Sequence, residues 1–156
     1  MGSDDVLHGH ELFRSLNVEE AHRLSGFSHT KTCEAGQTVF ECDRPGKHIF
    51  MLLRGSVSLK LPAAPSEFGI VVSKVNPGEI FGLSPLLDSP RYTTTAQCTE
   101  DSEILAIDAE PFRAMLHENC PVALDVLNRT ARIYFTRYLE VLRNLQAVVN
   151  QIHLVR

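Results

Sequence analysis

The chain has 156 residues, 44% of them hydrophobic and 22% charged, and its formal net charge is -4. This length suffices for one domain with its own core. The acidic balance argues against DNA binding by these residues themselves, because chains that grip nucleic acid carry a basic patch. No apolar run approaches the ~18 residues of a membrane span, and the polar start "MGSDDVLHGHELF" is not a signal peptide. We therefore expect a cytoplasmic protein without a membrane segment.

The cysteines give no sign of a metal centre. Cys33, Cys42, Cys98 and Cys120 lie far apart and form no C-x-x-C pair. A structural metal or an iron–sulfur cluster needs clustered ligands, so neither is indicated. Free thiols are the simplest interpretation, and a redox-sensing thiol stays open.

The first 120 residues predict helices around a set of short strands. Residues 10–27 look helical, with Asn17 and Glu20 spaced as a capping box. Between Thr30 and Asp108, short runs rich in β-branched and aromatic residues alternate with turn residues, which indicates a sandwich, jelly roll or barrel. These runs are 37–43, 47–55, 56–61, 68–75, 79–82, 91–98 and 103–108. We expect Asp108 to cap a short helix over 109–119, with Pro111 in its first turn.

The remainder, 121–156, predicts one long helix with an apolar seam. The seam has alternating spacings of four and three, as in a coiled coil, and consists of Leu127, Ala131, Tyr134, Tyr138, Val141, Leu145, Val148, Ile152 and Val155. A second stripe beside it holds Leu124, Phe135, Leu139, Leu142 and Val149. About 36 helical residues span about 54 Å, more than such a domain is wide. We therefore expect the far end to project and the seam to form a parallel homodimer. The alternative is one broad face packed on the chain's own core.

This order of elements resembles the effector domain of Crp/Fnr-type transcription regulators. The resemblance rests on "AGQTVFECDRPGKHIFMLLRGSVSLKL", "NPGEIFGLSPLLDSPR" and "AEPFRAML" before the long helix. The positions that match the family pattern are Gly36, Val39, Phe40, Asp43, Phe50, Gly55 and Val57. It implies a mainly β fold with flanking helices: a double-stranded β-helix (jelly roll) of the cyclic nucleotide-binding type over 1–120, then a dimerisation helix over 121–156. It also implies a small-molecule or gas effector, and DNA binding only through a helix-turn-helix domain that is absent from this chain.

The family's phosphate-binding loop would correspond to the effector-site candidates Gly78, Glu79, Gly82, Leu83, Ser84, Arg91 and Tyr92. Ser84 is a plausible N-cap and Pro85 a plausible first residue of a short helix through Leu87. Leu86 and Leu87 would press the loop onto the roll. Free N–H groups at the helix start and the Arg91 guanidinium would attract an anion. The alternative is that Arg91 pairs with Glu79 or Asp88.

Two departures from the pattern argue against cyclic AMP as the effector. The family has a glutamate for the ribose where this chain has Leu83, and serine or threonine where it has Tyr92. An apolar side chain cannot accept the ribose hydroxyl. A flat or apolar effector with one acidic group fits this loop better. A standard cyclic-nucleotide site remains the alternative.

Other relatives sense gases through haem or a cluster. The cluster type needs an N-terminal cysteine group, which is missing. Haem stays possible, although none of the histidines has a diagnostic neighbour; they are His8, His10, His22, His29, His48, His117 and His153. Cys42 replaces a family glycine before the turn aspartate, which suggests a reshaped turn or a reactive thiol.

Two other function classes are disfavoured. A nucleotide module of a kinase or channel typically ends in a short lid helix, unlike the long seam here. No catalytic motif or grouping is visible, so an enzyme is not expected.

Overall fold

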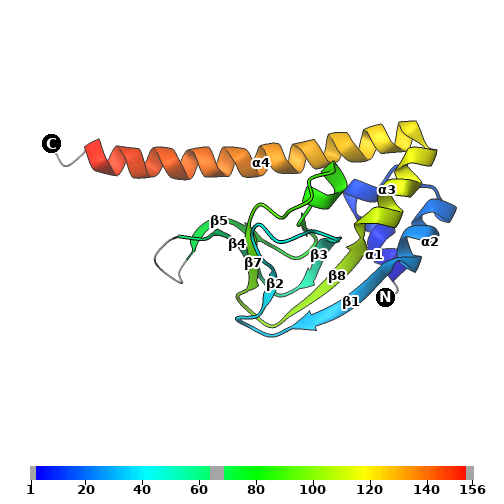
Figure 1. Ribbon diagram of the computed structural model, residues 1–156, viewed down its shortest axis with the longest axis horizontal. Helices are drawn as coiled ribbons and strands as arrows, with labels where there is room; N and C mark the ends of the chain where they lie inside the picture. The colour runs from blue at the N-terminus through cyan, green and yellow to red at the C-terminus, as the bar shows by residue number, and fades with distance from the viewer. Residues whose placement is uncertain (1–2, 64–68, 154–156) are drawn as a thin grey trace.

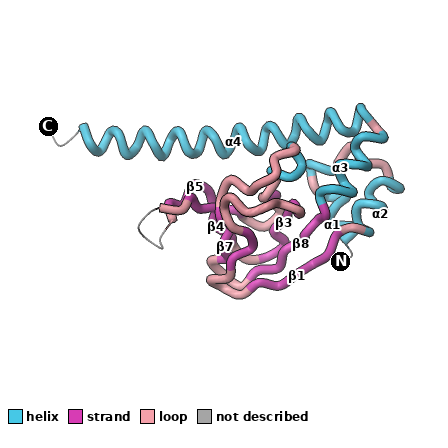
Figure 2. The backbone as a smooth tube through the Cα atoms, viewed as in Figure 1, coloured by secondary structure: helices cyan, strands magenta, loops and turns pink. Residues whose placement is uncertain are grey.

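The computed structural model describes residues 3–63 and 69–153, in which eight strands form two sheets and one long helix runs above them (Figures 1 and 2). The helical elements are α1 (Ser3–Gly9), the 3-10 turn η1 (Glu11–Phe13), α2 (Val18–Gly26), the 3-10 turn η2 (Ser84–Leu87), α3 (Ala109–Glu118) and α4 (Cys120–His153). The strands are β1 (Ser28–Cys33), β2 (Thr38–Phe40), β3 (His48–Arg54), β4 (Val57–Leu61), β5 (Ile70–Val75), β6 (Ile80–Phe81), β7 (Thr95–Cys98) and β8 (Ser102–Asp108).

The two sheets make the expected jelly roll. One sheet has the order β1-β8-β3-β6 and the other β2-β7-β4-β5, and all neighbouring strands are antiparallel. Strands that are neighbours in a sheet are mostly distant in the sequence, as in a roll. The predicted fold class is thereby confirmed.

The two central strands of the first sheet, β3 and β8, are buried on both faces. In β3, Ile49 and Met51 pack toward the helices, while Phe50 and Leu52 point into the roll. Successive side chains of a strand alternate between the faces of its sheet. Both faces of β3 are covered, which explains why "HIFMLL" reads as a continuous apolar run.

Strand β1 was missed by the sequence pattern. Its sequence, "SHTKTC", is mostly polar, and only Cys33 is buried. It is an edge strand that pairs with β8 along its whole length, from Ser28 opposite Ile107 to Cys33 opposite Ser102. Polar edge strands carry little periodic signal because one side of them faces solvent.

The predicted helix over 10–27 is interrupted. The chain forms the short turn η1 and then starts again with α2. Asn17 caps α2: its side chain accepts the Glu20 N–H at 2.8 Å, and the Glu20 carboxylate accepts the Asn17 N–H at 2.9 Å. The capping box is confirmed, and it begins a new helix because the N-cap residue is extended.

The predicted Asp108 cap is wrong in its side-chain role. Asp108 precedes α3, but its side chain makes no capping hydrogen bond. Its carboxylate instead pairs with His48 Nε2 at 2.9 Å. Pro111 lies in the first turn of α3, as expected.

Helix α4 packs on the domain with its first turns and leaves its apolar seam uncovered. Val122, Val126 and Thr130 are buried against the core. Of the seam, Tyr134 is half-buried, while the exposed members are Leu127, Ala131, Tyr138, Val141, Leu145, Val148 and Ile152; Val155 lies outside the described residues. The alternative of one broad face on the chain's own core is wrong, and the distal helix runs past β5 (Figure 1). The dimer itself stays a prediction.

Candidate functional site

The loop between β6 and β7 is shaped by a glycine under aromatic rings. Gly82 has φ +67, and a Cβ there would lie 2.9 Å from ring carbons of both Phe40 and Phe50. Only glycine combines this backbone angle with such a close approach at little cost. The retained Gly82 therefore has a packing reason that does not depend on a ligand.

The short helix forms, but its N-cap lies one residue earlier than predicted. Ser84 is the first residue of η2, and the N-cap is Leu83, which makes no side-chain capping bond. Pro85 has no N–H, so this single 3-10 turn presents few free donors. Leu86 is buried and anchors the loop, whereas Leu87 is exposed. The prediction that Ser84 caps this helix is wrong, and the anion site at the helix start stays a prediction.

Arg91 points away from the roll interior. It is exposed, and its guanidinium donates to the backbone carbonyl of Asp43. The suggested partners are engaged elsewhere, since Asp88 pairs with Arg113 at 2.7 Å and Glu79 accepts the Asn76 N–H at 2.8 Å. Arg91 neither forms the expected carboxylate pair nor supplies its charge to the interior.

Tyr92 occupies the interior instead. Its ring is 5% exposed and stacks on Phe40 with centroids 4.0 Å apart. Its hydroxyl donates to the His48 carbonyl at 2.7 Å and accepts the His48 N–H at 3.3 Å. Burial raises the pKa of this phenol. Because its hydroxyl is committed to the backbone, Tyr92 adds apolar ring surface to the interior and no free polar group.

A cavity of about 240 Å³ lies between the roll and α4. Its roll side includes Phe40, Leu59, Val72, Gly82, Leu83, Ser84 and Tyr92, and its helix side consists of Tyr134, Arg137, Tyr138 and Val141. Four predicted effector residues thus share one cavity: Gly82, Leu83, Ser84 and Tyr92. The cavity is smaller than typical ligand pockets of drug size and mostly apolar, so it suits a small ligand with few polar groups.

Arg137 is the cavity residue that sequence reasoning missed. It is half-buried, it lies on α4 among the apolar stripes, and its guanidinium donates to the Ile80 carbonyl on β6. Burial is the main effect on the pKa of Arg137 and lowers it, while the charges of Tyr134, Glu79 and Glu140 act in the opposite direction. The sequence signal that could have identified Arg137 was a cation between the apolar stripes of α4. The direction of its side chain, however, depends on how α4 packs against the roll.

The remaining two predicted residues, Gly78 and Glu79, line a second cavity of about 450 Å³. It lies between η1, the turn before β6 and α4, and it is rich in charged side chains. Arg137 borders both cavities. The loop candidates are therefore divided between two spaces.

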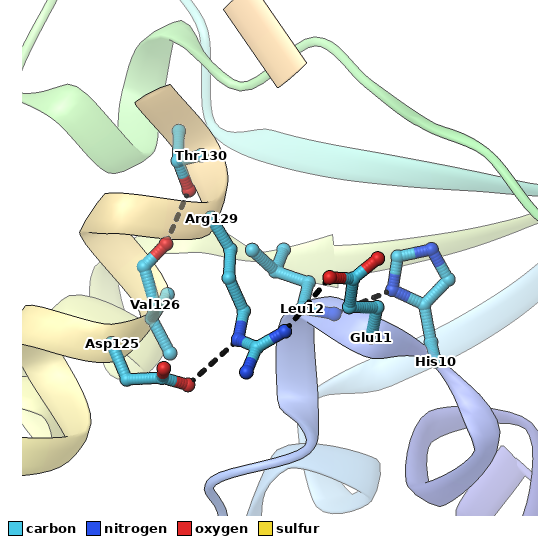
Figure 3. A network of polar contacts seen from close by, with 7 residues as sticks. All are labelled: His10, Glu11, Leu12, Asp125, Val126, Arg129 and Thr130. Carbon is cyan, nitrogen blue, oxygen red and sulfur yellow. Dashed lines mark hydrogen bonds and ion pairs between the residues drawn. The ribbon is translucent and has the colours of Figure 1, made fainter. Parts of the chain in front are cut away.

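Polar contacts tie the N-terminal turn to α4 at this second cavity (Figure 3). Arg129 donates to Asp125 at 2.8 Å and to Glu11 at 3.0 Å. The hydrogen bond from Arg129 lowers the pKa of Asp125. His10 accepts the Leu12 N–H at 3.0 Å, and burial lowers the pKa of its imidazole despite a hydrogen bond to the Gly78 backbone. The contact between Arg129 and Glu11 joins the first half of α4 to the N-terminal turn.

Cys42 does not take the left-handed conformation of the glycine it replaces. The positive φ falls on the next residue, Asp43, at 63°. The Cys42 N–H donates to Thr95 Oγ1 at 3.0 Å, and its thiol contacts the Thr93 carbonyl at 3.4 Å. Burial raises the pKa of this thiol, which disfavours the reactive thiolate.

Comparison with known proteins decides the family. The model of the cyclic nucleotide-binding domain matches residues 30–119. The chain belongs to this family. The cyclic AMP receptor protein of Thermus thermophilus is 26% identical over 125 residues, which are 80% of this chain and 57% of that protein. The domain spans only part of the curated relatives it matches, 30% and 57% of their lengths.

Solved structures of domains from two transcriptional regulators share this fold. The N-terminal domain of a transcriptional regulator from Streptomyces coelicolor matches with a TM-score of 0.67 and 26% identity, covering 85% of this chain and 92% of that one. The sensor domain of the transcriptional regulator DNR from Pseudomonas aeruginosa matches with a TM-score of 0.73 over 83% and 91% of the chains. At 22% identity, the second match shows the shared fold alone. The resemblance to Crp/Fnr effector domains is confirmed.

Two further observations bear on cofactor and membrane. The described lining of the 240 Å³ cavity contains neither histidine nor cysteine, and haem binding stays a prediction. Within residues 3–63 and 69–153, no helix combines the length and apolarity that crossing a bilayer requires.

Proposed function

We propose that this domain is the effector sensor of a Crp/Fnr-type transcription regulator and that it responds to a small ligand other than cyclic AMP. The observation that carries the proposal is the shared use of α4. Three residues of this helix that close the 240 Å³ cavity, Tyr134, Tyr138 and Val141, also belong to its apolar seam, most of whose described members are exposed. A ligand in the cavity therefore contacts the same helix that would bind a second copy.

The exposed seam supports the homodimer. Leu145 is 58% exposed, Val148 54% and Ile152 66%. A contiguous row of large apolar side chains at coiled-coil spacing marks an interaction site. In the complete cytoplasmic regulator, ligand binding would change how the paired α4 helices cross, and a helix-turn-helix domain outside this chain would contact DNA.

Sedimentation velocity tests the dimer. Val141→Lys combined with Leu145→Lys should convert a dimer into monomers at micromolar concentration, because the charges would face each other across the seam. The control places lysines at Gln146 and Asn150, which are also exposed but lie off the seam, and it should remain dimeric. A double seam variant that stays dimeric would contradict the proposed interface.

Calorimetric titration tests the effector. Leu83 is 1% exposed and offers no acceptor for a ribose hydroxyl, and Arg91 faces outward. Cyclic AMP should bind with a dissociation constant weaker than ~0.1 mM, corresponding to less than about 5.5 kcal/mol. A micromolar constant would establish the alternative, a true cyclic-nucleotide module.

A further inference from the structure

Arg137 forms no ion pair with any residue that the structure describes. Among the described residues, the atom that accepts its hydrogen bond is the Ile80 carbonyl oxygen, and no carboxylate lies within salt-bridge distance of it. Glu79 and Glu140 are near enough to favour its charge, but Glu140 accepts a hydrogen bond from Ser73 at 3.2 Å and Glu79 one from Asn76 at 2.8 Å. A half-buried guanidinium is stabilised most by an anion that it can hydrogen-bond directly.

The fork geometry of arginine leaves donors available. A guanidinium has five N–H groups, and the carbonyl of Ile80 needs one of them. The others can hold both oxygens of a carboxylate while the contact to β6 persists. Arg137 borders the 240 Å³ cavity, so an anion can be held at its edge.

The rest of the cavity selects a flat, apolar body. Aromatic rings of Phe40, Tyr92, Tyr134 and Tyr138 contribute to the walls, together with Leu83. Aromatic rings pack well on other flat rings in offset arrangements. Arg137 is the sole charged residue of the described lining, so a single acidic group on the ligand has one place to go. The hydroxyl residues of the described lining, Ser73, Ser84, Thr93 and Thr94, are neutral, so a second charge on the ligand would lose its hydration without meeting an opposite charge.

We infer that the cavity binds a small aromatic monoacid, with its ring between the roll and α4 and its carboxylate on Arg137. This inference rests on the proposed function, in which the same cavity is the effector site. It differs from the expectation drawn from the sequence in the residue that holds the acid, since Arg137 on α4 takes the place of Arg91 in the loop.

The experiment is a calorimetric titration of the full chain with benzoate and 2-naphthoate, each beside its neutral amide. We expect at least one acid to bind at least tenfold more tightly than its amide. Because this comparison uses the unaltered protein, it does not depend on how any variant folds. Equal affinity for acid and amide, or no binding of either acid up to ~1 mM, would overturn the inference.

Two matched variants test which arginine binds the carboxylate of the ligand. Arg137→Gln keeps a donor for the Ile80 carbonyl and removes the charge, so it should weaken acid binding at least tenfold and leave the amides unchanged. Arg91→Gln removes an exposed guanidinium of the same size and should change neither. Loss of acid binding in Arg91→Gln with retention in Arg137→Gln would return the anion site to the loop. Failure of these titrations leaves the sedimentation result intact, so a wrong ligand class is distinguishable from a wrong sensor assignment.

Discussion

Replacing Tyr92 by phenylalanine tests the role of the buried hydroxyl. The substitution keeps the ring on Phe40 but removes the oxygen that bonds to both the carbonyl and the N–H of His48. Leaving buried backbone groups unsatisfied costs about 1–3 kcal/mol. For a chain of this length, 1 kcal/mol corresponds to about 2–4 °C in melting temperature. A loss of ~2 kcal/mol therefore predicts a fall of about 4–8 °C in thermal denaturation followed by circular dichroism.

Tyr138→Phe is the matched control. Tyr138 is 56% exposed on α4, and its hydroxyl has no hydrogen-bond partner among the described residues. The substitution keeps the ring, which lines the 240 Å³ cavity and belongs to the proposed seam. Its removal should change stability by less than about 0.5 kcal/mol, as is usual for surface sites. Both variants are compared at one protein concentration, since dimerisation would add to stability. Equal melting temperatures for Tyr92→Phe and the unaltered protein would refute the interpretation that this hydroxyl holds the loop to β3.

Two further predictions follow from the ionisable groups. Burial keeps the pKa of His10 below its usual value of about 6.5, so the unfolded chain binds more protons in mildly acidic solution and stability falls as pH drops below that value. His10→Asn keeps an acceptor for the Leu12 N–H but does not titrate. Between pH 7.5 and pH 5, its free energy of unfolding in urea should therefore fall less than that of the unaltered protein. An equal fall in both proteins would count against a buried His10. Iodoacetamide at pH 8 should modify the exposed Cys120 well before Cys42, whose thiol pKa is raised by burial; peptide mass mapping that finds Cys42 modified first would show it to be a reactive thiol.

The sequence predicted those parts of the fold whose burial follows a simple period. The run over β3 was visible because all of Ile49 to Leu52 are buried. The capping box was visible because it depends on one short spacing, the three residues from Asn17 to Glu20. Strand β1 was not visible because its pairing with β8 comes from backbone hydrogen bonds, which any polar sequence can make.

The sequence indicated the loop that lines the cavity, but it did not indicate which arginine borders the cavity. Leu83 and Tyr92 were singled out as departures from the family pattern, and both line the cavity. Sequence spacing could not show that Arg91 turns toward the Asp43 carbonyl, because that direction depends on a bridge between Pro45 and Arg91. Nor could it place Arg137, since the face that α4 turns to the roll is fixed by contacts with segments more than fifty residues away.

Because α4 extends beyond its contacts with the domain, a small tilt of the helix displaces its distal end by a larger distance. Beyond the contact of Glu140 with Ser73, the described helical residues through Ile152 are exposed. From Arg137 to the described end of α4 at His153 is about 24 Å at 1.5 Å per residue. Each degree of tilt about Arg137 thus moves that end by about 0.4 Å. A tilt of about ten degrees would therefore move that end of the helix by about 4 Å.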